Sequence, residues 1–515
     1  MQNNFYITTP IFYANDKPHV GHAYTAIVSD VIARYFKSLN YNVCLSTGTD
    51  EHGIKVQKAA LKNYKKKTDD KYDSFSIVLK YVNIMSKNFD NMMIDMNIEY
   101  DKFIRTSAVK HKDFVRKFWN RLQKKGYIYI DDYEGWYSER DEAFVKEKDL
   151  VDGKAPSGAS VKWIAEKVHF FKLSKFGDRL LKYYKENKNS IKPVSRLNEV
   201  IAYLQNGLHD LCISRTGIDW GIKVPGLEKH TIYVWLDALT NYLSSIGFDL
   251  VEHDKKMKVK NAADMDNVND FNNIDKSNNE NVDNIVEGTC NNEKDESDNK
   301  NEEDRNDEIK NFWPCNLHVI GKDILIFHAV YWPAFLMALD IDLPKCILAH
   351  GWWLCGNEKM SKSLGNTLSH DKILNEFSSD VIRYCMIKEM KIGNDGNISM
   401  DMIKERYAGD LVNKVGNLVQ RVLVFIQKKF DFIVPYRGED FIKGELNSYL
   451  IKNINEYHKH MKEYEIHKGL KVVLNIVMHC NVYLNENPIW EKEIDTEKIL
   501  YELVIAIYYI AVLLR

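Results

Sequence analysis

Apolar residues recur along the first fifty positions in two different patterns. Residues 5–9 form a short apolar run that predicts a buried strand, whereas residues 20–36 carry apolar side chains at spacings of three and four, which predict a helix. A second strand-like run covers residues 41–47. Strand, helix and strand in this order form a βαβ unit, so we expect a parallel sheet with ligand loops at the carboxyl ends of its strands.

The pattern changes twice further along the chain. Short aromatic segments between charged turns predict an inserted α+β subdomain over about 127–225, and strand-like runs return at 231–235, 317–320 and 347–350. After about residue 400 the apolar stripes are helical to the end. We therefore expect an α/β protein with a Rossmann-like parallel-sheet domain, an inserted α+β subdomain and an all-α helical bundle.

The charge is unevenly distributed over the 515 residues. The formal net charge is −2, but residues 260–310 contain 16 acidic, 6 basic and 14 Asn residues, a local charge of −10. The other 464 residues carry 65 basic and 57 acidic side chains, which is +8. A segment so polar cannot bury enough apolar surface to fold, so we predict a disordered insert over 253–311. The basic remainder is compatible with a polyanionic partner.

Cysteine usage and hydropathy exclude other classes. The eight cysteines include no C-x-x-C pair and no His cluster at ligand spacing, which argues against a disulfide framework or a structural zinc site and fits a reducing compartment. The longest apolar run, residues 503–514, is shorter than the roughly 20 residues that cross a bilayer. We expect no membrane partner.

Two short motifs could bind a nucleotide. His19-Val20-Gly21-His22 stands where the first loop meets the first helix, and a helix N-terminus next to a glycine suits phosphate groups. The alternative is that the two histidines merely cap the helix. Lys359-Met360-Ser361-Lys362-Ser363 follows the apolar run 347–350, and its lysines could hold the charge that develops on a leaving pyrophosphate. The alternative is a solvated basic turn.

Together with the segments between them, these motifs resemble the methionyl-tRNA synthetase family of the class I aminoacyl-tRNA synthetases. The matching segments, in chain order, are residues 8–15, 48–53, 233–238, 320–324 and 350–353. The resemblance implies a first half of the catalytic domain at 1–125, a connective subdomain at 126–228, the second half at 229–355, a signature-loop and stem-contact region at 356–405, and an anticodon-binding helical domain at 406–515.

The resemblance also implies an activity and its residues. Methionine would react with ATP to give methionyl-adenylate and pyrophosphate, after which methionine passes to the 3′ end of its tRNA. ATP, accompanied by Mg²⁺, would be bound by His19, Gly21, His22, Lys359 and Lys362, of which both histidines and both lysines would be catalytic. Methionine would be bound by Asp50, which pairs with the ammonium group, and by Ile11, Tyr13, Trp235, Ala238, Tyr242, Ile324 and His328.

The helical domain should read the anticodon of tRNA(Met), the initiator included. Asn417 and Arg421 lie one helical turn apart on the family's anticodon positions, and Trp490 matches its stacking tryptophan, although a buried anchor between helices is the alternative. Many family members carry a zinc knuckle of paired C-x-x-C motifs, but residues 135–142 offer no thiolates, so we predict no structural zinc.

Other functions remain open at this point. A sister synthetase for another apolar amino acid would need a large editing insertion, a non-catalytic RNA-binding paralogue would be expected to lose the histidines or Lys362, and a smaller nucleotidylyltransferase would not explain Trp235 or Asn417. A monomer is the simplest expectation. The compartment is expected to be an organelle, mitochondrion or plastid, if a leader is missing from this chain, and otherwise the cytoplasm.

Overall fold

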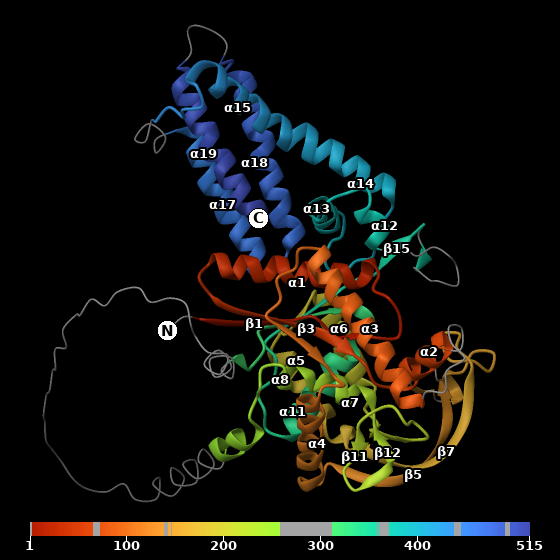
Figure 1. Cartoon of the computed structure of the whole chain (residues 1–515). Helices are drawn as coiled ribbons and strands as arrows, with labels where there is room; N and C mark the ends of the chain where they lie inside the picture. The colour runs from red at the N-terminus through yellow and green to blue at the C-terminus, as the bar shows by residue number, and fades with distance from the viewer. Residues whose placement is uncertain are drawn as a thin grey trace, which may run out of the picture.

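A computed structural model describes residues 3–64, 73–138, 143–145, 147–257, 312–356, 358–359, 370–436, 444–489 and 495–515. A part built on a central sheet carries an elongated helical bundle, which projects from one side of it (Figure 1). This arrangement agrees with the α/β class and the helical C-terminal part that the sequence predicts.

The central sheet is parallel, in the order β2-β3-β1-β13-β14-β8, and β4 also pairs with β3. Its strands are β1 (Asn4–Thr8), β2 (Phe12–Tyr13), β3 (Asn42–Asp50), β4 (Lys102–Arg105), β8 (Ile191–Lys192), β13 (Leu317–Gly321) and β14 (Ile347–His350). The strand predicted at 41–47 is thus confirmed and extends to Asp50. At Gly48 a Cβ atom would come within 2.0 Å of the Ile104 carbonyl oxygen, so the close approach of β3 and β4 requires glycine.

Four helices follow the strands of the first half: α1 (Val20–Ser38), α2 (Ile54–Tyr64), α3 (Ser74–Asp95) and α4 (Val109–Lys124). The predicted stripe of α1 is buried except for Val31, which is partly buried, and in Figure 1 this helix lies between the sheet and the helical bundle. One continuous apolar core includes α1, α13 (Ser379–Glu389) and the bundle helices α17 (Glu445–Lys462) and α18 (Ile466–Glu486). The bundle is therefore packed onto the sheet through α1.

The inserted subdomain is dominated by the long antiparallel pair β5 (Ile128–Ser138) and β7 (Val161–Phe171). Its other elements are β6 (Ala143–Val145), η1 (Glu147–Asp149), η2 (Leu173–Phe176), α5 (Gly177–Glu186), α6 (Val194–Gln205), β9 (Leu211–Cys212), β10 (Ser214–Thr216), β11 (Lys223–Val224) and β12 (Leu227–Ile232). However, β8 lies within the range 126–228 and pairs with β14 of the central sheet. The predicted subdomain is thus not separate throughout, because the chain returns to the main sheet inside it.

Two further expectations need correction. The strand predicted at 231–235 ends at Ile232, and helix α7 (Val234–Leu239) begins two residues later, before α8 (Asn241–Ser244). Residues 250–257 are helical, and Arg121 of α4 pairs with Asp254 at 2.9 Å. The prediction of disorder over 253–311 is therefore wrong for residues 253–257, which gain a partner outside the insert. Residues 258–311 lie outside the described residues.

The second half of the sheet part continues with η4 (Lys322–Ile324), η5 (Phe327–Tyr331) and α11 (Trp332–Ala338). A small sheet of β15 (Trp353–Cys355), β16 (Glu358–Lys359) and β17 (Gly396–Asn397) follows, with helices α12 (His370–Leu374) and α13 (Ser379–Glu389). The helical part comprises α14 (Met400–Arg406), η7 (Tyr407–Gly416), α15 (Asn417–Phe430), α17 (Glu445–Lys462), α18 (Ile466–Glu486) and α19 (Thr496–Leu514).

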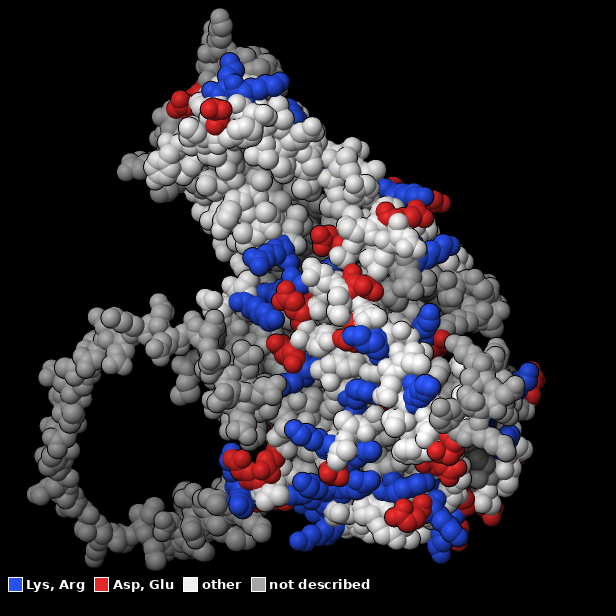
Figure 2. All heavy atoms as spheres, viewed as in Figure 1, with Lys and Arg blue, Asp and Glu red and all other residues white. Residues whose placement is uncertain are grey.

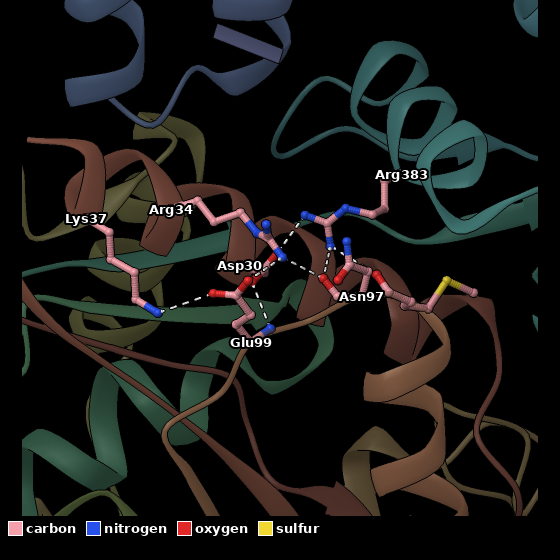
Figure 3. A network of polar contacts seen from close by, with 7 residues as sticks. Asp30, Arg34, Lys37, Asn97, Glu99 and Arg383 are labelled. Carbon is pink, nitrogen blue, oxygen red and sulfur yellow. Dashed lines mark hydrogen bonds and ion pairs between the residues drawn. The ribbon is translucent and has the colours of Figure 1, made fainter. Parts of the chain in front are cut away.

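A buried polar network fixes α1 to its neighbours (Figure 3). Asp30 of α1 accepts hydrogen bonds from Arg34 Nε at 2.8 Å, from Arg383 Nη2 of α13 at 2.5 Å and from the Glu99 backbone N–H at 3.1 Å. Both arginines also donate to the carbonyl oxygen of Asn97 in the turn after α3. The Asp30 carboxylate thereby connects α1 with α13 and with the segment that precedes β4.

Candidate active site

The loops that carry the predicted site residues share one edge of the sheet. Strand β1 lies between β3 and β13, and all three are parallel, so their carboxyl ends meet at the same edge. Ligands of open parallel sheets bind in the crevice at such an edge, where neighbouring loops diverge. Residues 9–22 follow β1, Asp50 ends β3, and residues 322–328 follow β13.

The N-terminus of α1 presents the first histidine motif. His19 is the N-cap, where its Nδ1 accepts a hydrogen bond from the Gly21 N–H at 3.1 Å, and His22 Nδ1 accepts one from the His19 N–H at 3.2 Å. The rings stack with centroids 3.8 Å apart, and a Cβ atom on Gly21 would come within 3.0 Å of the His19 ring. The two histidines therefore cap the helix, and this capping is compatible with the predicted role of the same residues in binding ATP.

Asp50 occupies the last position of β3 and is almost fully buried. The short strand β2 pairs with the end of β3 so that Tyr13 lies directly beside Asp50. Ile11 precedes β2 and is half-buried, as is Tyr13, whose ring has Lys55 Nζ 5.2 Å from its centroid. The structure thus brings the predicted ammonium-binding carboxylate next to Tyr13, one of the predicted methionine contacts.

The other predicted methionine contacts come from two segments that pack together. Trp235 of α7 stacks on Phe327 of η5 at a centroid distance of 3.6 Å, and its ring meets that of His328 edge to face at 6.4 Å. Tyr13, Trp235 and Ile324 pack against the same apolar core as Tyr242. Ala238 is buried on α7. An aromatic and aliphatic environment of this kind suits an unbranched thioether side chain.

His328 is held in one tautomer. Its Nδ1 lies 2.9 Å from the Ile324 carbonyl oxygen, to which it must donate, so its Nε2 accepts the hydrogen bond from the Tyr242 hydroxyl at 2.6 Å. Burial disfavours the imidazolium and lowers the pKa of His328 to about 4. At neutral pH the ring is therefore uncharged.

The second motif is only partly visible. Lys359 ends β16, which pairs with β15, but its side chain and the whole of Lys362 lie outside the described residues. Beside β15, Lys322 Nζ lies 4.1 Å from the centroid of the Trp352 ring and 2.7 Å from Asp395. Although burial acts in the opposite direction, hydrogen bonds from Lys322 and the Trp352 N–H lower the pKa of Asp395. Trp352, which directly precedes β15, is thus held by both members of an ion pair.

The predicted anticodon residues lie far from this edge, on α15. Asn417 is exposed at the start of the helix, and Arg421, one turn later, donates to Asn485 Oδ1 of α18 at 2.9 Å. Trp490 lies outside the described residues. On the face shown in Figure 2 the bundle carries few charged side chains between its distal end and its base, while Lys and Arg gather near α4 and β5.

Several polar residues at this edge are absent from the sequence-based prediction. Arg215 is buried, pairs with Glu166 at 2.7 Å, lies over the Tyr137 ring and lines a cavity of about 240 Å³. His52 and Asp237 form a buried pair. His52 and Asp237 both stand inside segments that match the family, residues 48–53 and 233–238, and that location was the signal available in the sequence.

Within the described residues, no group of three or more His, Cys, Asp or Glu side chains is arranged to hold a metal ion. Residues 139–142 of the segment that would carry a zinc knuckle lie outside that set, so the zinc prediction stays a prediction. In the same part of the chain, no helix is both long and apolar enough to span a membrane.

Comparison with known families agrees with this geometry. The family described as tRNA synthetases class I (M) matches residues 5–163, 145–271 and 289–423. The chain therefore belongs to the class I tRNA synthetases. Within that class it is a member of the methionyl-tRNA synthetase family, as the sequence motifs predicted.

Individual relatives extend over the whole chain. A methionine–tRNA ligase of Rickettsia felis is 41% identical over 100% of this chain and 90% of its own length, and one of Bacillus cereus is 37% identical over 96% of this chain and 68% of its own length. The solved structure of Mycobacterium tuberculosis methionyl-tRNA synthetase in complex with methionyl-adenylate is 35% identical, with a TM-score of 0.80 over 99% of this chain and 90% of that protein.

Proposed function

We propose that this chain is a methionine–tRNA ligase that forms methionyl-adenylate from methionine and ATP, releases pyrophosphate and transfers methionine to tRNA. The observation that carries the proposal is that Asp50 lies beside Tyr13, which packs against the same apolar core as Trp235 and Tyr242. The N-terminus of α1, with its two histidines, follows the same strand β1. The mycobacterial relative with bound methionyl-adenylate supports the same assignment.

The chemistry needs positioning and charge stabilisation, because the methionine carboxylate itself attacks the α-phosphate of ATP. The N-terminus of α1, with His19, Gly21 and His22, binds the phosphates through its N–H groups and imidazoles. Lys359 and Lys362 stabilise the negative charge on the departing pyrophosphate. Mg²⁺ enters with the nucleotide.

Methionine binds with its ammonium group on Asp50 and its side chain among the remaining predicted contacts: Ile11, Tyr13, Trp235, Ala238, Tyr242, Ile324 and His328. The neutral state of His328 suits an uncharged thioether, because an imidazolium there would need a counter-charge in a buried pocket. Rejection of an amino acid one methylene shorter is worth about 1–3 kcal/mol in such a pocket.

The helical part binds tRNA(Met), the initiator included. Asn417 is exposed on α15, and the bond between Arg421 and Asn485 sets the direction of that guanidinium for contact with splayed anticodon bases. Trp490 stacks on a base. A monomer without structural zinc is the simplest state, and the bacterial relatives favour the cytoplasmic alternative over an organelle.

Charging of tRNA tests this function. Purified protein, ATP, Mg²⁺ and labelled methionine should give acid-precipitable methionyl-tRNA with tRNA carrying a CAU anticodon. A tRNA with a changed anticodon should be charged at least about tenfold more slowly, since each lost base contact weakens binding. Efficient charging with another amino acid, or none with methionine, would contradict the proposal.

A further inference from the structure

Asp237 is a buried carboxylate in the middle of the predicted methionine site. It lies on α7 between Trp235 and Ala238, and its side chain is 2% exposed. Both of its oxygens are engaged, since Oδ2 lies 2.7 Å from His52 Nδ1 and Oδ1 lies 2.8 Å from His111 Nε2. The carboxylate thus faces away from solvent, toward two imidazoles.

The two imidazoles come from different parts of the fold. His52 stands two residues beyond Asp50, just after β3 ends. His111 lies on α4, and its Nδ1 is 2.7 Å from the Ser244 hydroxyl at the end of α8. Through one carboxylate, the end of β3 is connected with α4 and with the helix that carries Trp235.

The charge on Asp237 is what makes the connection strong. Burial alone would raise the pKa of this carboxyl, but the two imidazoles outweigh burial and lower the pKa to about 2. Asp237 is therefore ionised throughout the working pH range. A buried ionic group that loses its partners is costly, because water cannot replace them.

The neighbouring Glu51 is anchored separately. Its buried carboxylate accepts hydrogen bonds from Arg105, at 2.7 Å, and from Ser107, and its carbonyl oxygen accepts one from Trp220 Nε1 at 2.5 Å. The end of β3 therefore stays in place without Asp237. We therefore expect that loss of the Asp237 charge would shift α7, and with it Trp235, relative to a fixed Asp50.

We propose that Asp237 is a positioning residue that sets the distance between Asp50 and Trp235, the two predicted contacts at opposite ends of the methionine molecule. Asp237 itself touches no substrate and acts through His52 and His111. The inference rests on the proposed function, because it assigns those two contacts to methionine. It predicts a defect in methionine binding that leaves ATP binding intact, since the N-terminus of α1 is outside this network.

The test is methionine-dependent ATP–pyrophosphate exchange with the full chain. In Asp237→Asn the KM for methionine should rise at least about tenfold, the size expected when hydrogen bonds to a charged group are lost. The KM for ATP should stay within about twofold. A matched control is Asp410→Asn, which removes another buried carboxylate, bonded to the Tyr384 hydroxyl at 2.9 Å and Lys414 at 2.6 Å. It should change neither KM by more than about twofold.

His111 gives a second pair of variants in case Asp237→Asn does not fold. His111→Leu removes the donor and should raise the KM for methionine, whereas His111→Gln keeps an N–H donor and should restore most of the affinity. Folded Asp237→Asn or His111→Leu protein with the wild-type KM for methionine overturns the inference. An equal rise in both KM values, or no rescue by His111→Gln, also overturns it. The proposed function fails separately, if the wild-type chain shows no methionine-dependent exchange.

Discussion

The Asp30 network allows a quantitative prediction about stability. Asp30 is 1% exposed and pairs with Arg34 and Arg383, whose side chains are 19% and 11% exposed. Asp30→Ala removes the carboxylate and leaves both guanidinium groups largely buried without their counter-charge. Breaking a buried ion pair by deleting one partner costs about 3–5 kcal/mol. Alanine is the best helix former, so the loss would not come from helix propensity within α1.

The assay is thermal unfolding followed by circular dichroism. For a domain of about 150–250 residues, 1 kcal/mol corresponds to about 2–4 °C in Tm. Asp30→Ala should therefore lower the Tm by at least about 6 °C. The transition should also lose cooperativity, because the network joins α1 to α13 beneath the bundle.

The matched control is an exposed pair. Lys182 and Glu186 of α5 lie 4.0 Å apart with side chains 76% and 61% exposed. Such pairs contribute about 0–1 kcal/mol, so by the same conversion Glu186→Gln should shift the Tm by less than about 4 °C. Equal shifts for Asp30→Ala and Glu186→Gln would refute the reasoning that burial gives the Asp30 network its strength.

Three other outcomes are expected. Tyr242→Phe leaves the buried Nε2 of His328 without its donor, at a cost of about 1–3 kcal/mol, so the KM for methionine in pyrophosphate exchange should rise about tenfold; an unchanged KM would exclude the pair from the site. Burial lowers the pKa of His318, His328 and His350 in the folded chain, and the pKa of His328 falls to about 4. In the unfolded chain the same imidazoles bind protons near pH 6.5. Stability should accordingly be full above about pH 6.5 and fall as the pH drops toward 4, and a Tm that rises on acidification would contradict this sign. Gly48→Ala should give little folded protein in a solubility and circular dichroism assay, because its Cβ would meet the Ile104 carbonyl oxygen at 2.0 Å. Gly409→Ala, where an added Cβ meets no atom within 4 Å, should fold normally and tests whether any glycine change is harmful.

Local patterns predicted the elements that depend on local physics. The stripe over 20–36 corresponds to α1, and the strand-like run over 317–320 corresponds to β13. These elements were predictable because the spacing of apolar residues alone decides which face of a helix or strand is buried. The prediction of a strand over 231–235 was wrong for its second half, because a β-branched and aromatic segment is equally compatible with the buried first turn of a helix. Tertiary packing of Trp235 on Phe327 accompanies the helix there.

The candidate site was predictable by motif but not by geometry. The segments that resemble the family supplied Asp50 and Trp235, yet nothing in their spacing showed that a carboxylate two residues from Trp235 would bond to His52 and His111. Those partners are separated from Asp237 by 185 and 126 positions. Contacts at such distances arise only from the folded topology, which periodicity does not encode. The two-residue strand β8 was missed for a related reason, since it is too short for any pattern.

The central claim is that this edge of the sheet activates methionine. Amino-acid-dependent ATP–pyrophosphate exchange with the purified wild-type chain tests it most directly, with methionine, leucine, isoleucine and valine supplied in turn. Methionine should stimulate exchange at least about a hundredfold more efficiently than the branched amino acids, which do not fit a pocket shaped for an unbranched side chain. Exchange stimulated equally well by leucine, isoleucine or valine, or no exchange with methionine, would contradict the account.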